Sequence, residues 1–203
     1  MGKYMTFTNP EIESSYQRSD IGKILYNIVI STGATKIIDF GLLNGYSTTC
    51  LAMAAKITGG IVYGYDIFED YEYNNSSRDI VLSNLKRYNV DDYVVLKRMD
   101  FNDWVKEPED FDVLHVDISN DGDIISSLHR ATRHLNSIVL FEGGSEERDQ
   151  QDWMKKYNKK PICDIKDKYK PLSKNSYKKN NRMYYPSISV LINDAHKNMG
   201  VNT

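Results

Sequence analysis

The chain has 203 residues, a formal net charge of -2 and an apolar fraction of 40%. This length suits one domain with a sizeable core, and the near-neutral charge does not indicate a nucleic-acid or membrane partner for the chain as a whole. Two cysteines, Cys50 and Cys163, exclude a disulfide framework and a cysteine metal cluster. No apolar run reaches the roughly 20 residues of a membrane span, and no apolar signal-peptide stretch opens the chain. We therefore expect a cytoplasmic protein with no membrane partner.

The first part of the chain predicts an arm followed by a helix. Residues 1–18 form an N-terminal arm and the start of a cover helix, and the helix is expected over Glu11 to Thr32. The reason is the helical spacing of Ile21, Ile24, Leu25, Ile28 and Val29. We expect a single domain over residues 19–193 and a tail over 194–203.

The next stretch is typical of a strand–turn–helix–strand unit that holds a nucleoside. It predicts a strand over 36–40, a glycine turn from Gly41 to Gly45, a helix over 46–56 and a strand over 61–65 that leads into Asp66. A glycine turn lets the backbone approach a ligand closely. Asp66 lies 66 - 45 = 21 residues beyond Gly45, a spacing at which a carboxylate can reach the hydroxyls of a ribose.

The residues of the turn indicate which nucleoside. A dinucleotide site needs G-x-G-x-x-G, but Leu43 stands in place of the second glycine and the third glycine is missing, which disfavours a NAD-dependent dehydrogenase. Asp39 adds negative charge that a phosphate would avoid and that a cationic amino acid would favour. This combination resembles class I S-adenosylmethionine-dependent methyltransferases. The resemblance implies that Asp39 contacts the ammonium of the methionine end, and that cofactor-binding residues of the turn are Gly41, Leu42, Asn44, Gly45 and Ser47.

The rest of the chain extends this resemblance. SDIGKILYNIVISTGATKIIDFGLLNGYSTTCLA and YGYDIFED are similar to the catechol/caffeoyl-CoA and macrocin-type O-methyltransferase branch. The resemblance implies an α/β Rossmann-like methyltransferase fold, a seven-stranded mostly parallel sheet with a closing antiparallel strand and helices on both faces. Later helices are predicted over 74–89, 122–135 and from 146. Later strands are predicted over 91–97, 111–117, 137–141, 161–165 and 187–192.

Residues after the second and third strands complete the expected cofactor site. Ile67 follows Asp66, and the resemblance places Asp100 and Phe101 beside the adenine. Asp100 can accept a hydrogen bond from the exocyclic amine of adenine, and it can equally well act as a helix N-cap. The two roles are compatible. His115 fits a packed strand histidine better than a catalyst.

The resemblance also implies a divalent cation, but the match is incomplete. Asp117 and Glu142 fall at two ligand positions for Mg²⁺, with Asp117 also a catalytic and cofactor-binding candidate, while Gly143 occupies the third ligand position. The macrocin-type branch places an aspartate base at the position of Ser119, and the catechol branch places a lysine at the position of Asn120. Asp121 is therefore a second catalytic candidate.

A basic stretch sets the expectations for the acceptor. The loop expected over about 155–182 holds about eleven Lys or Arg against two Asp, interleaved with tyrosines. It fits a solvated loop or a flap that attracts an anionic acceptor. We expect O-methylation of a small hydroxylated or sugar acceptor. The alternatives are an N- or nucleic-acid methyltransferase that uses the basic loop, and a catalytically impaired S-adenosylmethionine-binding module. The oligomeric state is open and includes a homodimer.

Overall fold

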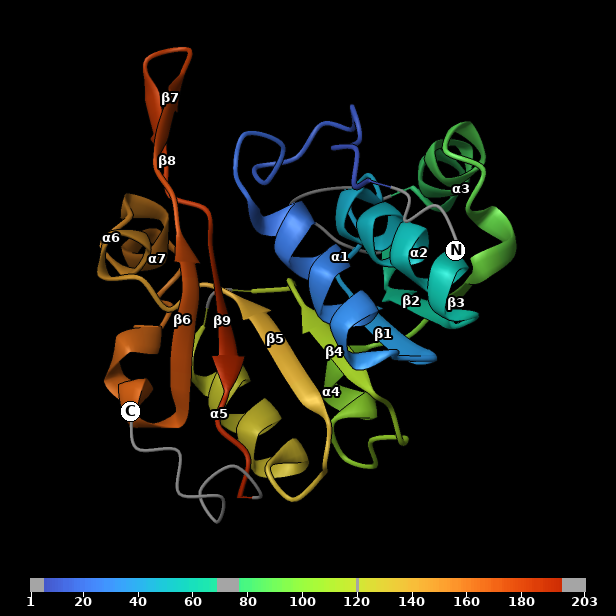
Figure 1. Ribbon diagram of the computed structural model, residues 1–203. Coiled ribbons are helices and arrows are strands. Elements are labelled where there is room, and N and C mark those ends of the chain that lie inside the picture. The colour runs from blue at the N-terminus through green and yellow to red at the C-terminus, as the bar shows by residue number, and fades with distance from the viewer. Residues whose placement is uncertain (1–5, 69–76, 120, 195–203) are drawn as a thin grey trace.

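The computed structural model describes residues 6–68, 77–119 and 121–194, which form an α/β domain (Figure 1). The strands are β1 (Lys36–Phe40), β2 (Ile61–Asp66), β3 (Val94–Arg98), β4 (Val113–Val116), β5 (Ile138–Glu142), β6 (Tyr169–Lys174), β7 (Tyr177–Lys179), β8 (Arg182–Tyr184) and β9 (Ser187–Leu191). The helices are α1 (Ile21–Thr32), α2 (Tyr46–Thr58), α3 (Arg78–Arg87), α4 (Phe101–Trp104), α5 (Gly122–Thr132), α6 (Glu146–Asp149) and α7 (Asp152–Lys156), with 3₁₀ turns η2 (Asp91–Tyr93) and η3 (Ile162–Lys168).

The described strands form a seven-stranded sheet in the order β3-β2-β1-β4-β5-β9-β6, and β7 pairs with β8 in a separate hairpin. Neighbouring strands from β3 to β5 are parallel, and β9 runs antiparallel to both β5 and β6. This arrangement confirms the predicted mostly parallel sheet with an antiparallel strand. The strand order reverses between β1 and β4, and ligands of open α/β sheets bind at such a switch point, beyond the carboxyl ends of the strands.

The register brings the predicted site residues to one edge. Phe40 pairs with Tyr65 on one side and with Val116 on the other, and Val116 pairs with Phe141. The next residue after each of these is Gly41, Asp66, Asp117 and Glu142. Four residues that are far apart in the sequence therefore lie side by side at the carboxyl ends of four neighbouring strands.

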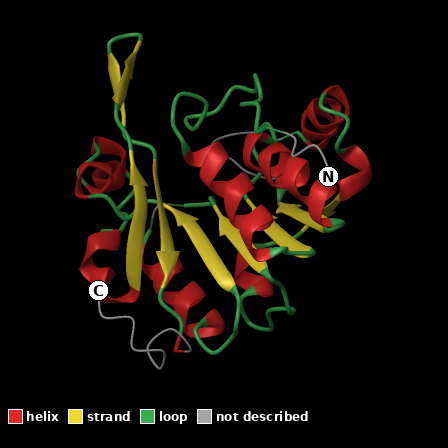
Figure 2. Cartoon of the chain, viewed as in Figure 1, coloured by secondary structure: helices red, strands yellow, loops and turns green. Residues whose placement is uncertain are grey.

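Helices lie on both faces of the sheet (Figure 2), and buried apolar side chains pack between them and the strands. On one face, α1, α2 and α3 bury residues such as Leu25, Leu51 and Leu85 against Ile37 and Val62. On the other face, α4, α5 and η3 enclose a second cluster, with these members among others: Phe40, Phe101, Trp104, Leu114, Leu128 and Ile162. Because the central strands are covered on both faces, they are apolar without alternation.

Three predicted elements differ from the structure. The cover helix begins at Ile21 and not at Glu11, because the preceding segment forms turns in which Ser14 and Ser19 hydrogen-bond to the backbone of Tyr16. The strand predicted over 161–165 is the 3₁₀ turn η3, since the Asp149 carboxylate accepts a hydrogen bond from the Cys163 N–H (2.8 Å). The helix predicted from 74 begins at Arg78, and residues 74–76 lie outside the described residues.

The basic stretch is not a loop. It includes the end of α7, η3, β6 and the β7–β8 hairpin, which projects beyond the sheet in Figure 1. The hairpin is attached to the N-terminal segment, because the Tyr177 hydroxyl donates to the Ser15 carbonyl (2.9 Å) and Lys179 lies 3.5 Å from Glu13. None of the described helices combines the length and the apolar character needed to cross a bilayer.

Candidate active site

A cavity of about 720 Å³ opens at the carboxyl edge of the sheet. This size is in the range of small-molecule and cofactor sites, roughly 300–1,000 Å³. A cavity of about 40 Å³ adjoins it through Ser15, Gly41, Leu43 and Asp117, which line both. Of the predicted cofactor-binding residues, the large cavity is lined by Gly41, Asp66, Ile67, Asp100, Phe101 and Asp117, and the small one also by Leu42, Asn44 and Ser47.

Asp66 both fixes the glycine turn and faces the large cavity. Its Oδ2 accepts a hydrogen bond from the Leu42 N–H (2.7 Å), and its Oδ1 accepts one from the Phe68 N–H (2.7 Å). Each carboxylate oxygen can accept about two hydrogen bonds, so both oxygens keep acceptor capacity toward the cavity. Asp66 can therefore receive two hydroxyl groups of a ligand while the backbone N–H groups hold it in place.

Gly41 lines the cavity, but its contact with the backbone of Asp117 explains why this position is a glycine. Its φ is +85°, and a Cβ built there would lie 2.1 Å from the carbonyl oxygen of Asp117. The turn is tied to the strands, since the Gly41 N–H donates to the Tyr65 carbonyl (3.0 Å) and the Asp117 N–H donates to the Phe40 carbonyl (2.8 Å). The close approach of β1 and β4 thus requires the glycine independently of any ligand.

Asp39 does not line either cavity, and the predicted direct contact with a ligand ammonium does not fit its position. Its carboxylate is fully buried. Oδ2 accepts hydrogen bonds from Ser47 (2.9 Å) and Thr48 (2.7 Å), and Oδ1 lies 2.7 Å from Nδ1 of His115. Asp39 therefore anchors the first turn of α2 to β1 and β4, and His115 is the packed strand histidine that the sequence predicts.

Gly45 also lies off the cavity walls. It precedes α2 with a φ of +82°, and a Cβ there would lie 3.1 Å from Cγ1 of Val81, so its role is to turn the chain against α3. Asn44 is held by the protein. Its side-chain amide donates to the backbone carbonyl of Glu13 (3.1 Å), and its backbone carbonyl accepts from the side-chain amide of Asn84 (2.8 Å). The turn is thus preorganised before any ligand enters.

The wall expected to face adenine contains Asp100 and Phe101. Asp100 is exposed and caps α4 by accepting the Asn102 N–H (2.7 Å), so both roles considered for it from the sequence are compatible with its place on the wall. Phe101 lines the cavity while its ring packs against Phe40 at 5.6 Å and an interplanar angle of 87°. This part of the cavity wall therefore offers one aromatic ring and one exposed carboxylate.

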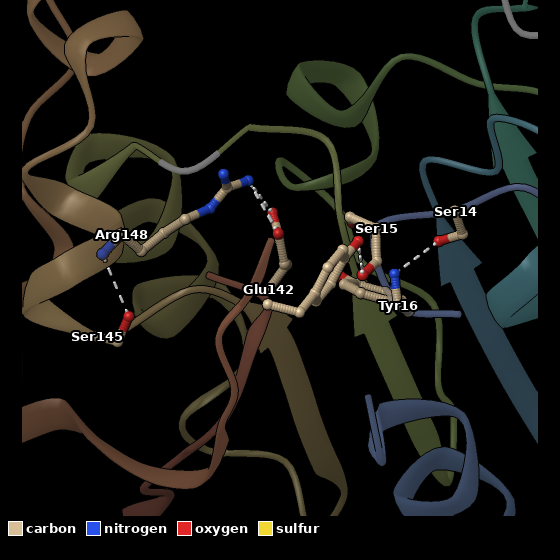
Figure 3. Close-up of polar contacts among 7 residues, drawn as sticks. Ser14, Ser15, Tyr16, Glu142, Ser145 and Arg148 are labelled. Atoms are coloured by element: carbon tan, nitrogen blue, oxygen red, sulfur yellow. Dashed lines mark hydrogen bonds and ion pairs between the residues drawn. The ribbon is translucent and has the colours of Figure 1, made fainter. Parts of the chain in front are cut away.

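The opposite end holds a buried charged cluster (Figure 3). The Nη2 of Arg148 donates to both oxygens of Glu142 (2.9 and 3.0 Å), and its guanidinium lies 4.9 Å from the centre of the Trp153 ring. Burial raises the pKa of Asp117 well above its usual range, and the nearby charge of Glu142 raises it further. Burial also raises the pKa of Tyr16, whose hydroxyl faces Asp117.

The residues present do not fit the magnesium site that the sequence suggests. Asp117 and Glu142 do come together, but both oxygens of Glu142 are bound by Arg148, and a dication would be repelled by that guanidinium. Gly143 offers no side-chain ligand and adopts a φ of +116°, which favours glycine. Within residues 6–68, 77–119 and 121–194, no group of three His, Cys, Asp or Glu side chains could hold a metal ion.

Asp121 is not placed to act as a base in the cavity. It does not line the wall, and its Oδ1 caps α5 by accepting the Asp123 N–H (2.9 Å). Its other oxygen lies 3.8 Å from Lys159. The catalytic role of Asp121 stays a prediction that this geometry does not favour, because one oxygen of the carboxylate caps α5 and the residue does not line the cavity.

Sequence reasoning missed three residues of the charged end, Tyr16, Arg148 and Trp153. Arg148 and Trp153 lie in the short helices after β5 and reach the wall only through the fold. A weak signal for Arg148 is its position three residues after Ser145, whose hydroxyl caps α6 by accepting the Arg148 N–H (3.3 Å). No sequence pattern marks Tyr16, which lies in the irregular segment before α1.

Comparison with known proteins places this fold. No family model and no curated protein matches the chain. Among solved structures, an O-methyltransferase from Bacillus cereus in complex with SAH is 19% identical, with a TM-score of 0.58 over 90% of this chain and 84% of that one. The O-methyltransferase TomG from Streptomyces achromogenes, in complex with SAM, is 15% identical, with a TM-score of 0.57 over 85% and 79%. A putative O-methyltransferase from Klebsiella pneumoniae is 13% identical, with a TM-score of 0.58 over 86% and 80%. The chain therefore has the Rossmann-like fold of these methyltransferases.

Proposed function

We propose that the large cavity binds S-adenosylmethionine and that the protein transfers its methyl group to a small hydroxylated or sugar acceptor. The observation that carries this proposal is the arrangement of Asp66, which is fixed by two backbone N–H groups and keeps acceptor capacity toward the cavity. Two of the structural neighbours are complexes with SAM or SAH, which supports the same ligand here. The resemblance places the adenine beside Asp100 and Phe101, which line the same cavity as Asp66.

The chain's own residues then have distinct tasks. Bound S-adenosylmethionine supplies an electrophilic methyl group on sulfur. The acceptor oxygen must be held in line with that group and must lose a proton as the new bond forms. Asp117 lines both cavities and is the carboxylate at the centre of this edge. Its raised pKa brings it closer to the range in which a carboxylate works as a general base, so we assign it the acceptor proton.

The acceptor end of the cavity favours an anionic small molecule. Arg148, Lys159 and Arg182 line it, together with Trp153 and Tyr157. Glu142 balances Arg148, and Asp121 lies 3.8 Å from Lys159, so Arg182 is the cation of this wall whose described contacts include no carboxylate. A hydroxylated acid or a phosphorylated sugar would complement this wall.

Two alternatives use the same residues differently. A nucleic-acid or N-methyltransferase would use the basic β6–β8 region, but Tyr177 and Tyr184 stack on each other at 5.0 Å, and Arg18 and Arg182 lie over these rings at 6.0 and 5.5 Å, so contacts within the chain already occupy the aromatic faces that a base would need. A binding module without catalysis would keep Asp66 and lack a base, consistent with Ser119 and Gly143 at the positions that the resemblance assigns to catalysis and metal binding.

The test is a methyl-transfer assay that follows the release of S-adenosylhomocysteine. Hydroxylated acids and sugar phosphates are compared with their neutral analogues and with a single-stranded oligonucleotide. Turnover that prefers the anionic small molecules supports the proposal. Turnover only on the oligonucleotide, with a steep decrease as salt rises, would favour the nucleic-acid alternative. Cofactor binding without turnover on any acceptor would favour the binding module.

A further inference from the structure

Two carboxylates meet at the edge of the sheet where the acceptor is expected. Asp117 follows Val116, Glu142 follows Phe141, and these two preceding residues are register partners in β4 and β5. Burial and then the charge of Glu142 raise the pKa of Asp117, and both residues line the large cavity. Two neighbouring carboxylates need either a nearby cation or a shared proton, because their like charges repel each other.

Arg148 supplies that cation from within the chain. Its Nη2 bridges both oxygens of Glu142, at 2.9 and 3.0 Å, and Trp153 covers the face of its guanidinium. The backbone of Arg148 is also held, because its N–H donates to the Ser145 hydroxyl. Figure 3 shows the guanidinium pointing at Glu142 across the gap between α6 and β5. The arginine is therefore positioned by three independent contacts.

We infer that Arg148 takes the place of a divalent metal ion at the acceptor end and binds the acceptor through its remaining donors. Nε and Nη1 have no hydrogen-bond partner among the described residues, and Nε is buried. A planar guanidinium with free donors matches a carboxylate or phosphate oxygen. The acceptor-binding part of this inference rests on the proposed function, whereas the replacement of the metal ion does not.

The experiment uses Mn²⁺ alone as the probe, with electron paramagnetic resonance to count bound and free ion on the full chain. We expect the wild-type protein to bind no Mn²⁺ at this site. Arg148→Ala removes the resident cation, so it should bind Mn²⁺ at least about tenfold more tightly than the background binding of the wild-type protein, and the double variant with Glu142→Gln should lose this gain. Arg133→Ala, which breaks the pair with Asp194 outside the cavity, is the matched control and should behave as wild type.

Two results would overturn the inference. One is a Mn²⁺ site in the wild-type protein that Glu142→Gln abolishes. The other is a folded Arg148→Ala protein, checked by circular dichroism, with no gain in Mn²⁺ affinity. If Arg148→Ala does not fold, Arg148→Lys keeps the charge without the planar fork and should still exclude Mn²⁺. Binding of S-adenosylhomocysteine to the wild-type protein is measured separately, so a failure of the proposed function is distinguished from a failure of this inference.

Discussion

Replacement of Asp39 by alanine tests whether this carboxylate is a buried anchor. The change removes three buried contacts of 2.7 to 2.9 Å, to Ser47, Thr48 and His115. Removing one partner of such a buried polar network costs about 3–5 kcal/mol, because the other partners stay buried without it. In a domain of this size, 1 kcal/mol shifts the melting temperature by roughly 2–4 °C, so we expect a decrease of roughly 6–20 °C.

The assay is thermal unfolding followed by circular dichroism, with Asp112→Ala as the matched control. Asp112 also makes three contacts, to the Thr35 N–H (2.8 Å), the Thr35 hydroxyl (3.2 Å) and the Lys36 N–H (2.9 Å), but it is exposed. Water can replace these bonds, so we expect a decrease of only about 2–4 °C. Equal decreases for the two variants would refute the anchor. An Asp39→Asn protein that keeps its melting temperature but loses cofactor affinity would restore the direct contact predicted from the sequence.

The remaining predictions concern the cavity wall. Asp66→Ala should weaken S-adenosylhomocysteine binding by about 1–3 kcal/mol, measured by calorimetry, and unchanged affinity would show that Asp66 does not hold the ligand. Because the pKa of Asp117 is raised in the folded protein, wild-type stability should decrease as the pH rises above the usual carboxyl range. Asp117→Asn should therefore gain melting temperature relative to wild type between pH 4 and pH 8, and a constant difference would argue against the raised pKa. Gly41→Ala should destabilise the fold more than Gly33→Ala, whose added Cβ meets nothing within 4 Å and costs about 1–2 kcal/mol for its positive φ alone; equal chemical-denaturation midpoints would contradict the clash with Asp117.

The fold was largely predictable because its signals are local. The β1–turn–α2–β2 unit follows from apolar runs and the two glycines, and a parallel sheet then brings Gly41, Asp66, Asp117 and Glu142 to one edge. The error at Ile162–Lys168 has the opposite cause, since a short apolar run does not distinguish a strand from a turn. There the deciding contact is the hydrogen bond from the Cys163 N–H to the Asp149 carboxylate, and Asp149 lies outside the apolar run.

The site was predictable only in part, because several roles depend on residues far along the chain. Asp39 resembles a ligand residue by its place beside the turn, yet its partner His115 is 115 - 39 = 76 positions away, and only the β1–β4 register shows that they meet. Arg148 lies in the short helix α6, only 148 - 142 = 6 positions after Glu142, but the spacing alone does not show that its side chain turns back to that carboxylate. The sequence therefore predicts where a cation belongs without showing that the chain provides one.

The most direct test of the central claim is calorimetric titration of the protein with S-adenosylhomocysteine, together with Asp66→Ala. The proposed site predicts one binding event per chain in the wild-type protein and a clear loss of affinity in the variant. It further predicts no change in wild-type affinity when magnesium is replaced by a chelator, because Arg148 holds the cation position. Absence of binding to a folded wild-type protein would contradict the assignment of the cavity to this cofactor.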